Sequence, residues 1–300
     1  MGSARAESAR VRRALGVNTW VWASPVTDAR LSALAPLARE FGYAVLELPV
    51  EQPGDWSPEV AAGILAEHDM EARIVGAMGA GRDLLDDSSR AATQDYLRHC
   101  VDVAVTLGSP TVAGPFTART GRVWRMDAGE RAAAIRDLRL AIAPVAAYAA
   151  ERAVTLAIEP LNRYETSLIN TVDQALDVLD PFLGAGTGVA LALDTYHLNI
   201  EERDPAAAVR AAGHHCAVVQ VCGNDRGPVG GDHTDWNALL DALDDIDYRG
   251  PLTLESFTAD NDTIATAASI WRPLAESPDA LARQSAAFLN DLHEQRSQAR

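Results

Sequence analysis

The stretch CAVVQVCGNDRGPVGGDHTDW, residues 216–236, begins as an apolar run and then breaks into polar residues and glycines. Its first half predicts a buried strand, because strands that are covered on both faces are almost continuously apolar. Gln220, Asn224, Asp225 and Arg226 stand at or just after the end of that strand. Ligands of α/β folds bind at the C-terminal ends of parallel strands. The stretch therefore predicts a strand whose end lines a site.

Seven further apolar segments resemble this strand and recur at intervals of roughly 25 to 45 residues, with amphipathic Ala- and Leu-rich segments between them. They are residues 15–22, 44–50, 72–78, 110–116, 154–161, 188–198 and 251–257. Eight βα units in a chain of this length predict a (β/α)8 TIM barrel. A doubly wound sheet is the alternative, but the sequence lacks the phosphate-binding glycine fingerprint that usually follows an early strand of that fold.

Three of the predicted helices are clear from the sequence, and two of them have recognisable ends. They cover residues 90–108, where Gly108 is a C-cap, residues 128–152, and residues 277–295, where Ser277 is an N-cap followed by Pro278. The sequence contains no internal repeat, low-complexity linker or shift in composition. We therefore expect a single barrel domain over residues 14–300, preceded by a disordered tail over residues 1–13.

The composition is that of an ordinary globular protein, with 48% hydrophobic and 23% charged residues. A net charge of −16 argues against a nucleic-acid partner, because phosphate binding relies on a basic surface. The apolar runs are too short to cross a membrane, and no signal-peptide core follows the basic start. Cys100, Cys216 and Cys222 form no disulfide framework, which favours a reducing compartment and a cytoplasmic location.

Four consecutive predicted strands end in a side chain that can bind a cation: Glu159, Asp194, Gln220 and Glu255. In a barrel these ends converge on one mouth. Crowded, buried carboxylates repel one another unless a cation joins them, and oxygen ligands suit Mg²⁺ or Mn²⁺. The pattern predicts a divalent metal site with these four ligands. His233, in the loop after strand seven, is the alternative to Gln220, although a loop histidine can also simply bond to backbone or solvent.

Two carboxylates at one metal site can also move protons. A metal that binds a carbonyl and its neighbouring hydroxyl acidifies the C–H bond between them. Glu159 could then remove a proton from one face of a sugar while Glu255 supplies one on the other face. The residues thus predict proton abstraction beside a carbonyl group.

The motifs around these residues resemble the sugar isomerase/epimerase superfamily of xylose isomerase-like barrels, and most of all the D-tagatose and D-psicose 3-epimerases. EPLNRYET (159–166) is similar to the strand-five motif, which implies that Glu159 is a metal ligand and catalytic carboxylate and that Glu165 contacts the substrate. LDTYHLN (193–199) is similar to the strand-six motif, which implies that Asp194 is a ligand and that His197 contacts the substrate. The likeness runs from about residue 14 to the C-terminus.

The resemblance continues through the last two strands, with one departure. Arg226 matches an arginine that contacts the substrate, and LESF (254–257) places Glu255 as the last ligand and second catalytic carboxylate. The epimerases carry a histidine ligand six residues before the arginine, where this chain has Gln220. A glutamine oxygen can bind Mg²⁺ or Mn²⁺, and related barrel dehydratases of keto-acids resemble this sequence in using one there. A glutamine in place of the histidine favours harder cations over Zn²⁺ or Cu²⁺.

Several other residues have two open interpretations. Trp20, at the end of strand one, and Phe116, after strand four, could wall a sugar site or pack in the core. Glu47, near the end of strand two, could bond a sugar hydroxyl or cap a helix. Cys222 lies two residues past Gln220 on the same strand face, and we interpret it as a packing residue rather than a nucleophile.

The leading hypothesis is a metal-dependent ketose 3-epimerase with Glu159 and Glu255 as its acid–base pair. The alternative is a lyase that cleaves 3-oxo-glycosides or dehydrates keto-compounds. Gln220, in place of the histidine, favours this alternative. Enzymes that cleave C-glycosides resemble this superfamily and work with a small second subunit. Apurinic endonucleases share the barrel but need a His-rich zinc cluster and a basic surface, which argues against that class. A non-catalytic binding barrel would not need the three carboxylates Glu159, Asp194 and Glu255, which argues against that class too. Analogy with such barrels implies a homo-oligomer acting on a small sugar.

Overall fold

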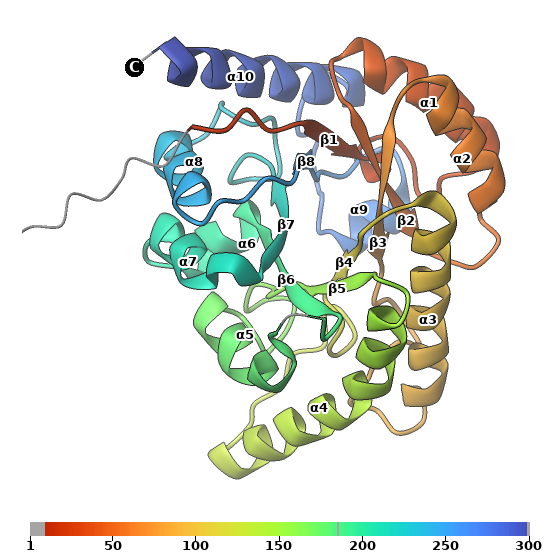
Figure 1. The fold of residues 1–300 in the computed structure, drawn as a ribbon, viewed down its shortest axis with the longest axis vertical. Helices are drawn as coiled ribbons and strands as arrows, with labels where there is room; N and C mark the ends of the chain where they lie inside the picture. The colour runs from red at the N-terminus through yellow and green to blue at the C-terminus, as the bar shows by residue number, and fades with distance from the viewer. Residues whose placement is uncertain (1–9, 185, 299–300) are drawn as a thin grey trace, which may run out of the picture.

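The computed structural model describes residues 10–184 and 186–298, and its centre is a closed barrel of eight parallel strands in sequence order (Figure 1). The strands are β1 Leu15–Asn18, β2 Val45–Val50, β3 Glu71–Gly76, β4 Thr111–Gly114, β5 Thr155–Ile158, β6 Val189–Asp194, β7 Cys216–Val221 and β8 Leu252–Leu254. Each lies within, or within one residue of, one of the eight predicted segments. The predicted single-domain TIM barrel is confirmed.

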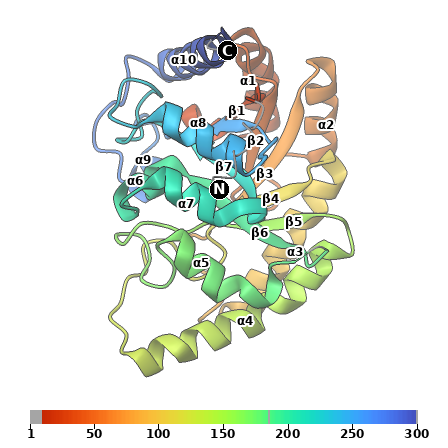
Figure 2. The ribbon, with the colours of Figure 1, turned by 60° about the vertical axis from the view of Figure 1, so that its left-hand side comes forward.

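Helices surround the barrel in both ribbon views (Figures 1 and 2). The described α-helices are α1 Asp28–Glu40, α2 Pro58–Glu67, α3 Arg90–Leu107, α4 Ala128–Ala150, α5 Val172–Leu179, α6 Thr195–Glu201, α7 Pro205–Ala212, α8 Trp236–Asp245, α9 Asp262–Ala267 and α10 Pro278–Gln298. Short 3₁₀ turns cover Thr19–Val21 (η1), Asp180–Phe182 (η2) and Gly213–His215 (η3). With helices outside and side chains filling the interior, strands such as β2 and β4 are buried along their whole length.

The last helix packs beside the first, which closes the ring of helices (Figures 1 and 2). The Tyr43 hydroxyl donates a hydrogen bond to the Ala282 carbonyl at 2.7 Å, and the Arg283 guanidinium lies 4.7 Å from the centre of the Phe41 ring. These contacts join the α1–β2 connection to α10. The barrel therefore needs residues from both ends of the chain.

The predicted helix ends are set by local side-chain and backbone geometry. Gly108 adopts the left-handed conformation, with φ 66°, and ends α3 as predicted. The Ser277 hydroxyl accepts a hydrogen bond from the Ala280 amide at 3.1 Å and so caps α10, as predicted. Asp127 and Glu130 form a reciprocal capping box at the start of α4.

The prediction of a strand over residues 188–198 is wrong in its second half. β6 ends at Asp194, and α6 begins at Thr195. The reason is local: Asp194 Oδ1 accepts a hydrogen bond from the Tyr196 amide at 2.9 Å and caps the helix. His197 therefore lies on a helix rather than on a strand end.

The N-terminal boundary of the packed chain lies before residue 13. Residues 1–9 of the predicted tail are outside the described residues. Arg13 is buried, its Nη2 lies 2.7 Å from Asp244 Oδ1, and its Nε donates to the Tyr248 carbonyl at 3.0 Å. These contacts tie the first described residues to the barrel.

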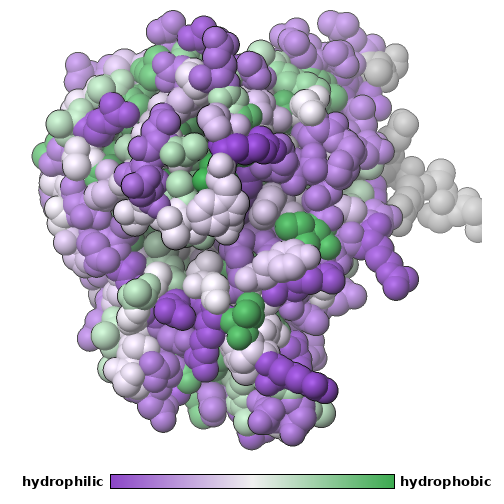
Figure 3. Space-filling view, turned by 180° about the vertical axis from the view of Figure 1, so that it is seen from behind, coloured by the Kyte–Doolittle hydropathy of each residue, from purple (hydrophilic) through white to green (hydrophobic). Residues whose placement is uncertain are grey.

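One face of the molecule, seen from behind, is mainly polar. Figure 3 shows the face opposite to that of Figure 1, where hydrophilic side chains predominate and hydrophobic ones lie singly or in small groups. None of the helices within residues 10–184 and 186–298 is both long and apolar enough to cross a membrane.

Candidate active site

A cleft of about 550 Å³ opens at the C-terminal ends of the barrel strands. This volume is in the range of small-molecule sites. The polar residues that line it include Glu159, Glu165, His197, Arg226 and Glu255. The apolar residues that line it include Trp20, Met78, Leu161, Phe257 and Ile264. The cleft thus combines a reactive polar set with apolar walls.

The cleft brings together most of the residues predicted from the sequence. Glu159 directly follows β5, Glu255 directly follows β8, and Arg226 stands in the loop after β7. Asp194 and Gln220, which are 1% and 0% exposed, lie behind the lining and bond to Arg226 and to Glu255, respectively. Converging strand ends thus gather carboxylates from three strands at one place.

The Arg226 guanidinium is the centre of the polar cluster. Its Nη1 lies 2.5 Å from Asp194 Oδ2 and 3.1 Å from Glu255 Oε2, and its Nη2 lies 3.2 Å from His197 Nε2. Aromatic rings flank it: the guanidinium carbon lies 4.1 Å from the centre of the Tyr196 ring and 5.1 Å from that of Phe257. Cation–π contacts of this kind add to the ion pairs in a desolvated site.

A tight turn after β7 presents Arg226 to the cluster. The Gly223 amide donates to the Gly227 carbonyl at 2.9 Å, and Arg226 between them has φ 67°. A bulky residue in this left-handed region is unusual and marks a position held by its surroundings. The Ser256 hydroxyl donates to the Arg226 carbonyl at 2.6 Å, which fastens the turn to the residue after Glu255.

Hydrogen bonding fixes the ring of His197. The Asn162 backbone amide donates to His197 Nδ1 at 3.1 Å, so the neutral ring carries its proton on Nε2. The 3.2 Å approach of Arg226 Nη2 to Nε2 is then a close contact rather than a hydrogen bond, because a guanidinium can only donate. Burial lowers the pKa of His197, which favours this neutral form. Nε2 lies 3.4 Å from Glu159 Oε1 and 3.6 Å from Asp194 Oδ2. The Asn162 side chain also donates to Glu165 Oε1 at 2.7 Å, so one asparagine positions two predicted substrate contacts.

Burial and mutual repulsion change the acidity of the carboxylates. Burial raises the pKa of Glu159 well above its usual range, and the charges of Glu255 and Asp194 raise it further. Burial also raises the pKa of Glu255, although Arg226 opposes the shift. Carboxyl groups of this kind can hold a proton near neutral pH, as general acids and bases require.

The donor set fits a divalent cation. Glu159 Oε1 and Gln220 Oε1 are buried and have no hydrogen-bond partner within the described part of the chain. Buried oxygens without a partner are uncommon in folded proteins and call for a water or an ion. Ligand atoms of Glu159, Asp194 and His197 lie within 4.8 Å of one another. Carboxylate and amide oxygens with at most one imidazole suit Mg²⁺ or Mn²⁺.

Two of the residues predicted from the sequence lie elsewhere. Phe116 is fully buried and does not line the cleft, because its ring fills the space beside Gly76 and Gly114. His233 is exposed, and its Nε2 lies 2.9 Å from Asn199 Oδ1 on α6. Cys222 is fully buried among the cluster residues, and burial raises the pKa of its thiol, in agreement with a packing role.

Two features of the site were not among the predicted residues. Tyr196, which stacks on Arg226, stands within the strand-six motif next to His197. Asn162 stands within the strand-five motif, three residues before Glu165. Asn162 could have been found from its spacing, because residues three and four apart in a turn or helix are neighbours. Tyr196 has no such spacing to His197, and only its place inside the motif points to it.

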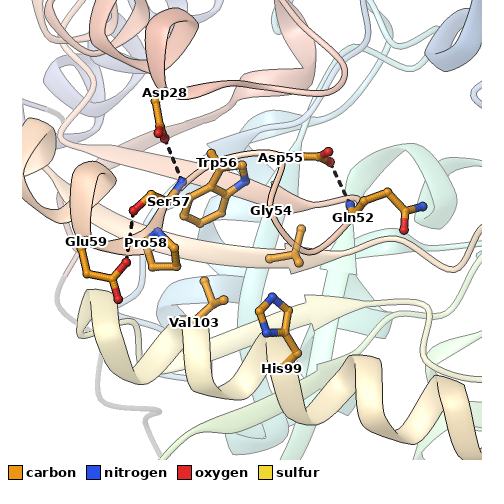
Figure 4. A pocket seen from close by; sticks show the side chains of 11 residues that line it. Asp28, Gln52, Gly54, Asp55, Trp56, Ser57, Pro58, Glu59, His99 and Val103 are labelled. Carbon is orange, nitrogen blue, oxygen red and sulfur yellow. Dashed lines mark hydrogen bonds between the residues drawn. The ribbon is translucent and has the colours of Figure 1, made fainter.

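A second hollow, of about 350 Å³, lies among residues after β2 and on α2 and α3 (Figure 4). It shares no lining residue with the cleft. Its polar groups bond to one another: the Ser57 amide donates to Asp28 Oδ1 at 2.8 Å, the Ser57 hydroxyl donates to Glu59 at 3.1 Å, and the Gln52 amide donates to Asp55 Oδ2 at 2.9 Å. These are helix-capping and turn contacts, so the reactive chemistry lies in the cleft.

Comparison with known proteins decides the family. A family model described as xylose isomerase-like TIM barrel matches residues 35–292. The chain belongs to the xylose isomerase-like TIM barrel family. Within it, the chain is 30% identical over 279 residues to an L-ribulose 3-epimerase of Mesorhizobium japonicum, covering 92% of each protein. It is 29% identical over 278 residues to an L-ribulose 3-epimerase of Methylomonas sp. (strain DH-1), covering 91% of this chain and 96% of the relative.

A solved structure extends the likeness to three dimensions. The crystal structure of a D-allulose 3-epimerase from Methylomonas sp. in complex with D-allulose matches with a TM-score of 0.83 and 28% identity. The match covers 93% of this chain and 97% of that one. The predicted resemblance to ketose 3-epimerases is confirmed.

Proposed function

We propose that this protein is a divalent-cation-dependent ketose 3-epimerase. The observation that carries the proposal is the presence of two buried carboxylates, Glu159 and Glu255, on one sugar-sized cleft, in a chain whose relatives are named ketose 3-epimerases. The two side chains come from β5 and β8, three strands apart around the barrel. They therefore approach the cleft from different sides, as an exchange of protons between two faces of one carbon requires.

The side chains of the cleft have distinct roles in this proposal. Glu159 takes the proton from one face of the carbon beside the carbonyl, and Glu255 returns a proton on the other face. His197 donates its Nε2 proton to a substrate oxygen, while Glu165 and Arg226 hold neighbouring hydroxyls. Trp20 forms an apolar wall against the C–H face of the sugar. Because the carboxyl groups are buried, water competes poorly with the substrate for their protons.

The cation is proposed to be Mn²⁺ or Mg²⁺, held by Glu159, Asp194, Gln220 and Glu255. When bound, it polarises the carbonyl and acidifies the adjacent C–H bond. The unpartnered Oε1 atoms of Glu159 and Gln220 support this set. The exposed position of His233 and its contact with Asn199 argue against His233 as the fourth ligand.

The test is an isotope-exchange experiment on the Mn²⁺-loaded protein. D-Fructose, D-tagatose, L-ribulose and a 3-oxo-glucoside are incubated in D₂O, and both deuterium uptake and products are followed by NMR. Deuterium at C3 together with the epimer of a ketose supports the proposal. Glu151→Gln, at the exposed C-cap position of α4, is the matched control for Glu159→Gln.

The alternative reaction, elimination, begins with the same proton removal. Gln220 in the place of the histidine found in ketose 3-epimerases is the observation that favours it. Inert ketoses and a 3-oxo-glucoside that releases its aglycone would contradict the epimerase proposal and establish a lyase, for which a small second subunit is expected. We also infer a homo-oligomer by analogy, and a cytoplasmic location from three free cysteines.

A further inference from the structure

Glu47 on β2 lies in a chain of hydrogen bonds that crosses the barrel to Gln220 on β7. Glu47 is 1% exposed and does not line the cleft. Its Oε2 accepts from Asn18 Nδ2 at 2.8 Å and from Gln220 Nε2 at 2.8 Å. Gln220 Nε2 also donates to Glu255 Oε1 at 2.9 Å. A residue buried outside the cleft is thus bonded to a proposed cation ligand.

The Trp20 backbone amide fixes which groups donate and which accept along this series of hydrogen bonds. The Trp20 backbone amide, which can only donate, donates to Asn18 Oδ1 at 2.9 Å. Asn18 therefore presents its Nδ2 to Glu47. The Glu47 carboxylate accepts from Asn18, and the same oxygen accepts from Gln220, so the Gln220 amide must turn its nitrogen toward β2. Its oxygen, Oε1, is left facing away from these partners.

The orientation of the Gln220 amide decides what it offers to a cation. With the nitrogen bonded to both Glu47 and Glu255, Oε1 is buried without a partner. An amide rotated by half a turn would present an N–H₂ group instead, which repels a cation. Burial raises the pKa of Glu47 to about 7, and the hydrogen bonds from Gln220 and Asn18 oppose the shift by favouring its ionised, accepting form.

We propose that Glu47 is a positioning residue that orients the Gln220 amide so that its oxygen faces the cation site. This inference rests on the proposed divalent-cation function. Partners that hold a metal ligand from behind fix its orientation and commonly change metal affinity by about 10–100-fold when removed. A histidine ligand would need only one acceptor for its second ring N–H. A glutamine ligand needs a partner that fixes which of its two amide atoms, the oxygen or the nitrogen, faces the cation.

The test measures Mn²⁺ binding by chelator-treated protein through the EPR signal of free Mn²⁺. Glu47→Met keeps the length of the side chain and removes the acceptor, and we expect it to weaken Mn²⁺ binding about tenfold or more. Glu47→Gln is the matched control, because its amide oxygen can still accept from both Asn18 and Gln220. We expect Glu47→Gln to retain most of the affinity, since only the charge is lost.

The same Glu47 substitution in a Gln220→Glu variant distinguishes two roles of Glu47: orienting the Gln220 amide, and stabilising the barrel in general. Gln220→Glu carries an oxygen at both ends of its carboxylate and needs no orienting partner. In that background Glu47→Met restores the charge of the wild type, and we expect it to leave Mn²⁺ affinity nearly unchanged. If Glu47→Met does not fold alone, Glu47→Ala, which leaves room for water, replaces it in both backgrounds.

The outcomes are distinct. A large loss of Mn²⁺ affinity in Glu47→Met, a small one in Glu47→Gln and none in the Gln220→Glu background support the inference. Equal losses in Glu47→Met and Glu47→Gln would mean that Glu47 acts through its charge, and would overturn it. Normal affinity in Glu47→Met, with Glu159→Gln impaired, would overturn it and leave the cation site standing. A wild type that binds no Mn²⁺ would overturn both this inference and the proposed function.

Discussion

Arg226 Nη1 lies 2.5 Å from Asp194 Oδ2, and the same nitrogen lies 3.1 Å from Glu255 Oε2. One buried guanidinium thus neutralises two carboxylates that we propose as cation ligands. A divalent cation bound to Asp194 and Glu255 would compete with Arg226 for the same oxygen atoms. Arg226 therefore balances the charge of the site in the cation-free protein and is available to hydroxyl groups of the substrate once a cation is bound.

This arrangement predicts that Arg226→Met destabilises the cation-free protein. Removing one partner of a buried ion pair typically costs about 3–5 kcal/mol of unfolding free energy. We expect added Mn²⁺ to recover much of this loss, because it supplies the missing positive charge. Urea unfolding with EDTA and with Mn²⁺ measures both effects. The control is Arg272→Met, which removes an exposed ion pair to Asp225 in the same region and should cost at most about 1 kcal/mol. Equal costs in both variants would contradict the prediction.

The two carboxylates that we propose as the acid–base pair predict that each variant loses deuterium exchange from one C3 epimer only. Glu159→Gln and Glu255→Gln should each slow epimerisation by about 10²–10⁴-fold, the usual contribution of a positioned acid or base. Each variant keeps one carboxyl group, so deuterium exchange from one of the two C3 epimers should persist while exchange from the other is lost. NMR of each pure epimer in D₂O distinguishes the two. A variant that loses exchange equally from both epimers would show that its carboxylate acts only as a cation ligand.

The fold could be predicted because each barrel strand is a short apolar run between amphipathic helices. β7, for example, is the apolar half of the opening stretch and ends at Val221, one residue after Gln220. Strand ends were less predictable, since they depend on single side chains. The hydropathy of residues 188–198 does not reveal that the Asp194 carboxylate caps a helix. Capping depends on a local hydrogen bond from one side chain, and the pattern of apolar residues carries no information about it.

The candidate site could be predicted where it depends on topology alone. Residues at the ends of parallel strands meet at the mouth of a barrel, so Glu159 and Glu255 were found from their positions. For Phe116 the sequence left a site wall and core packing open. The structure places it in the core, because its ring packs against Gly76 and Gly114, two positions without side chains on neighbouring strands. The hydrogen bond from Gln220 to Glu47 joins strands far apart in sequence across the barrel interior. A single sequence carries no signal of such a pair.

His293 on α10 predicts how stability depends on pH. It is 3% exposed, its ring nitrogens have no partner among the described residues, and burial together with Arg13 lowers its pKa to about 4. Between pH 6.5 and about 4 the unfolded chain binds a proton there that the folded chain does not. Stability is therefore fully present above pH 6.5 and falls as the pH drops through this window, by up to about 3 kcal/mol.

The measurement for His293 is urea unfolding at a series of pH values. His293→Leu cannot bind the proton, so its unfolding free energy should fall less than that of the wild type over the same window. His99, a partly exposed histidine on α3, provides the control variant His99→Leu, which should follow the wild-type slope. Parallel slopes for the wild type and His293→Leu would mean that His293 already titrates normally in the folded protein.

Gln220→His predicts a change in cation preference. An imidazole replaces a neutral oxygen donor by a nitrogen donor, which favours borderline cations such as Zn²⁺ over Mg²⁺. Its second ring N–H can still donate to Glu47, so the orienting contact is retained. We expect the ratio of Zn²⁺ to Mg²⁺ affinity to rise on the order of tenfold or more. Competition titrations on chelator-treated protein measure this ratio. Gln220→Asn, which is too short to reach the same point, should weaken both cations alike. An unchanged ratio in Gln220→His would show that the side chain at position 220 does not touch the cation.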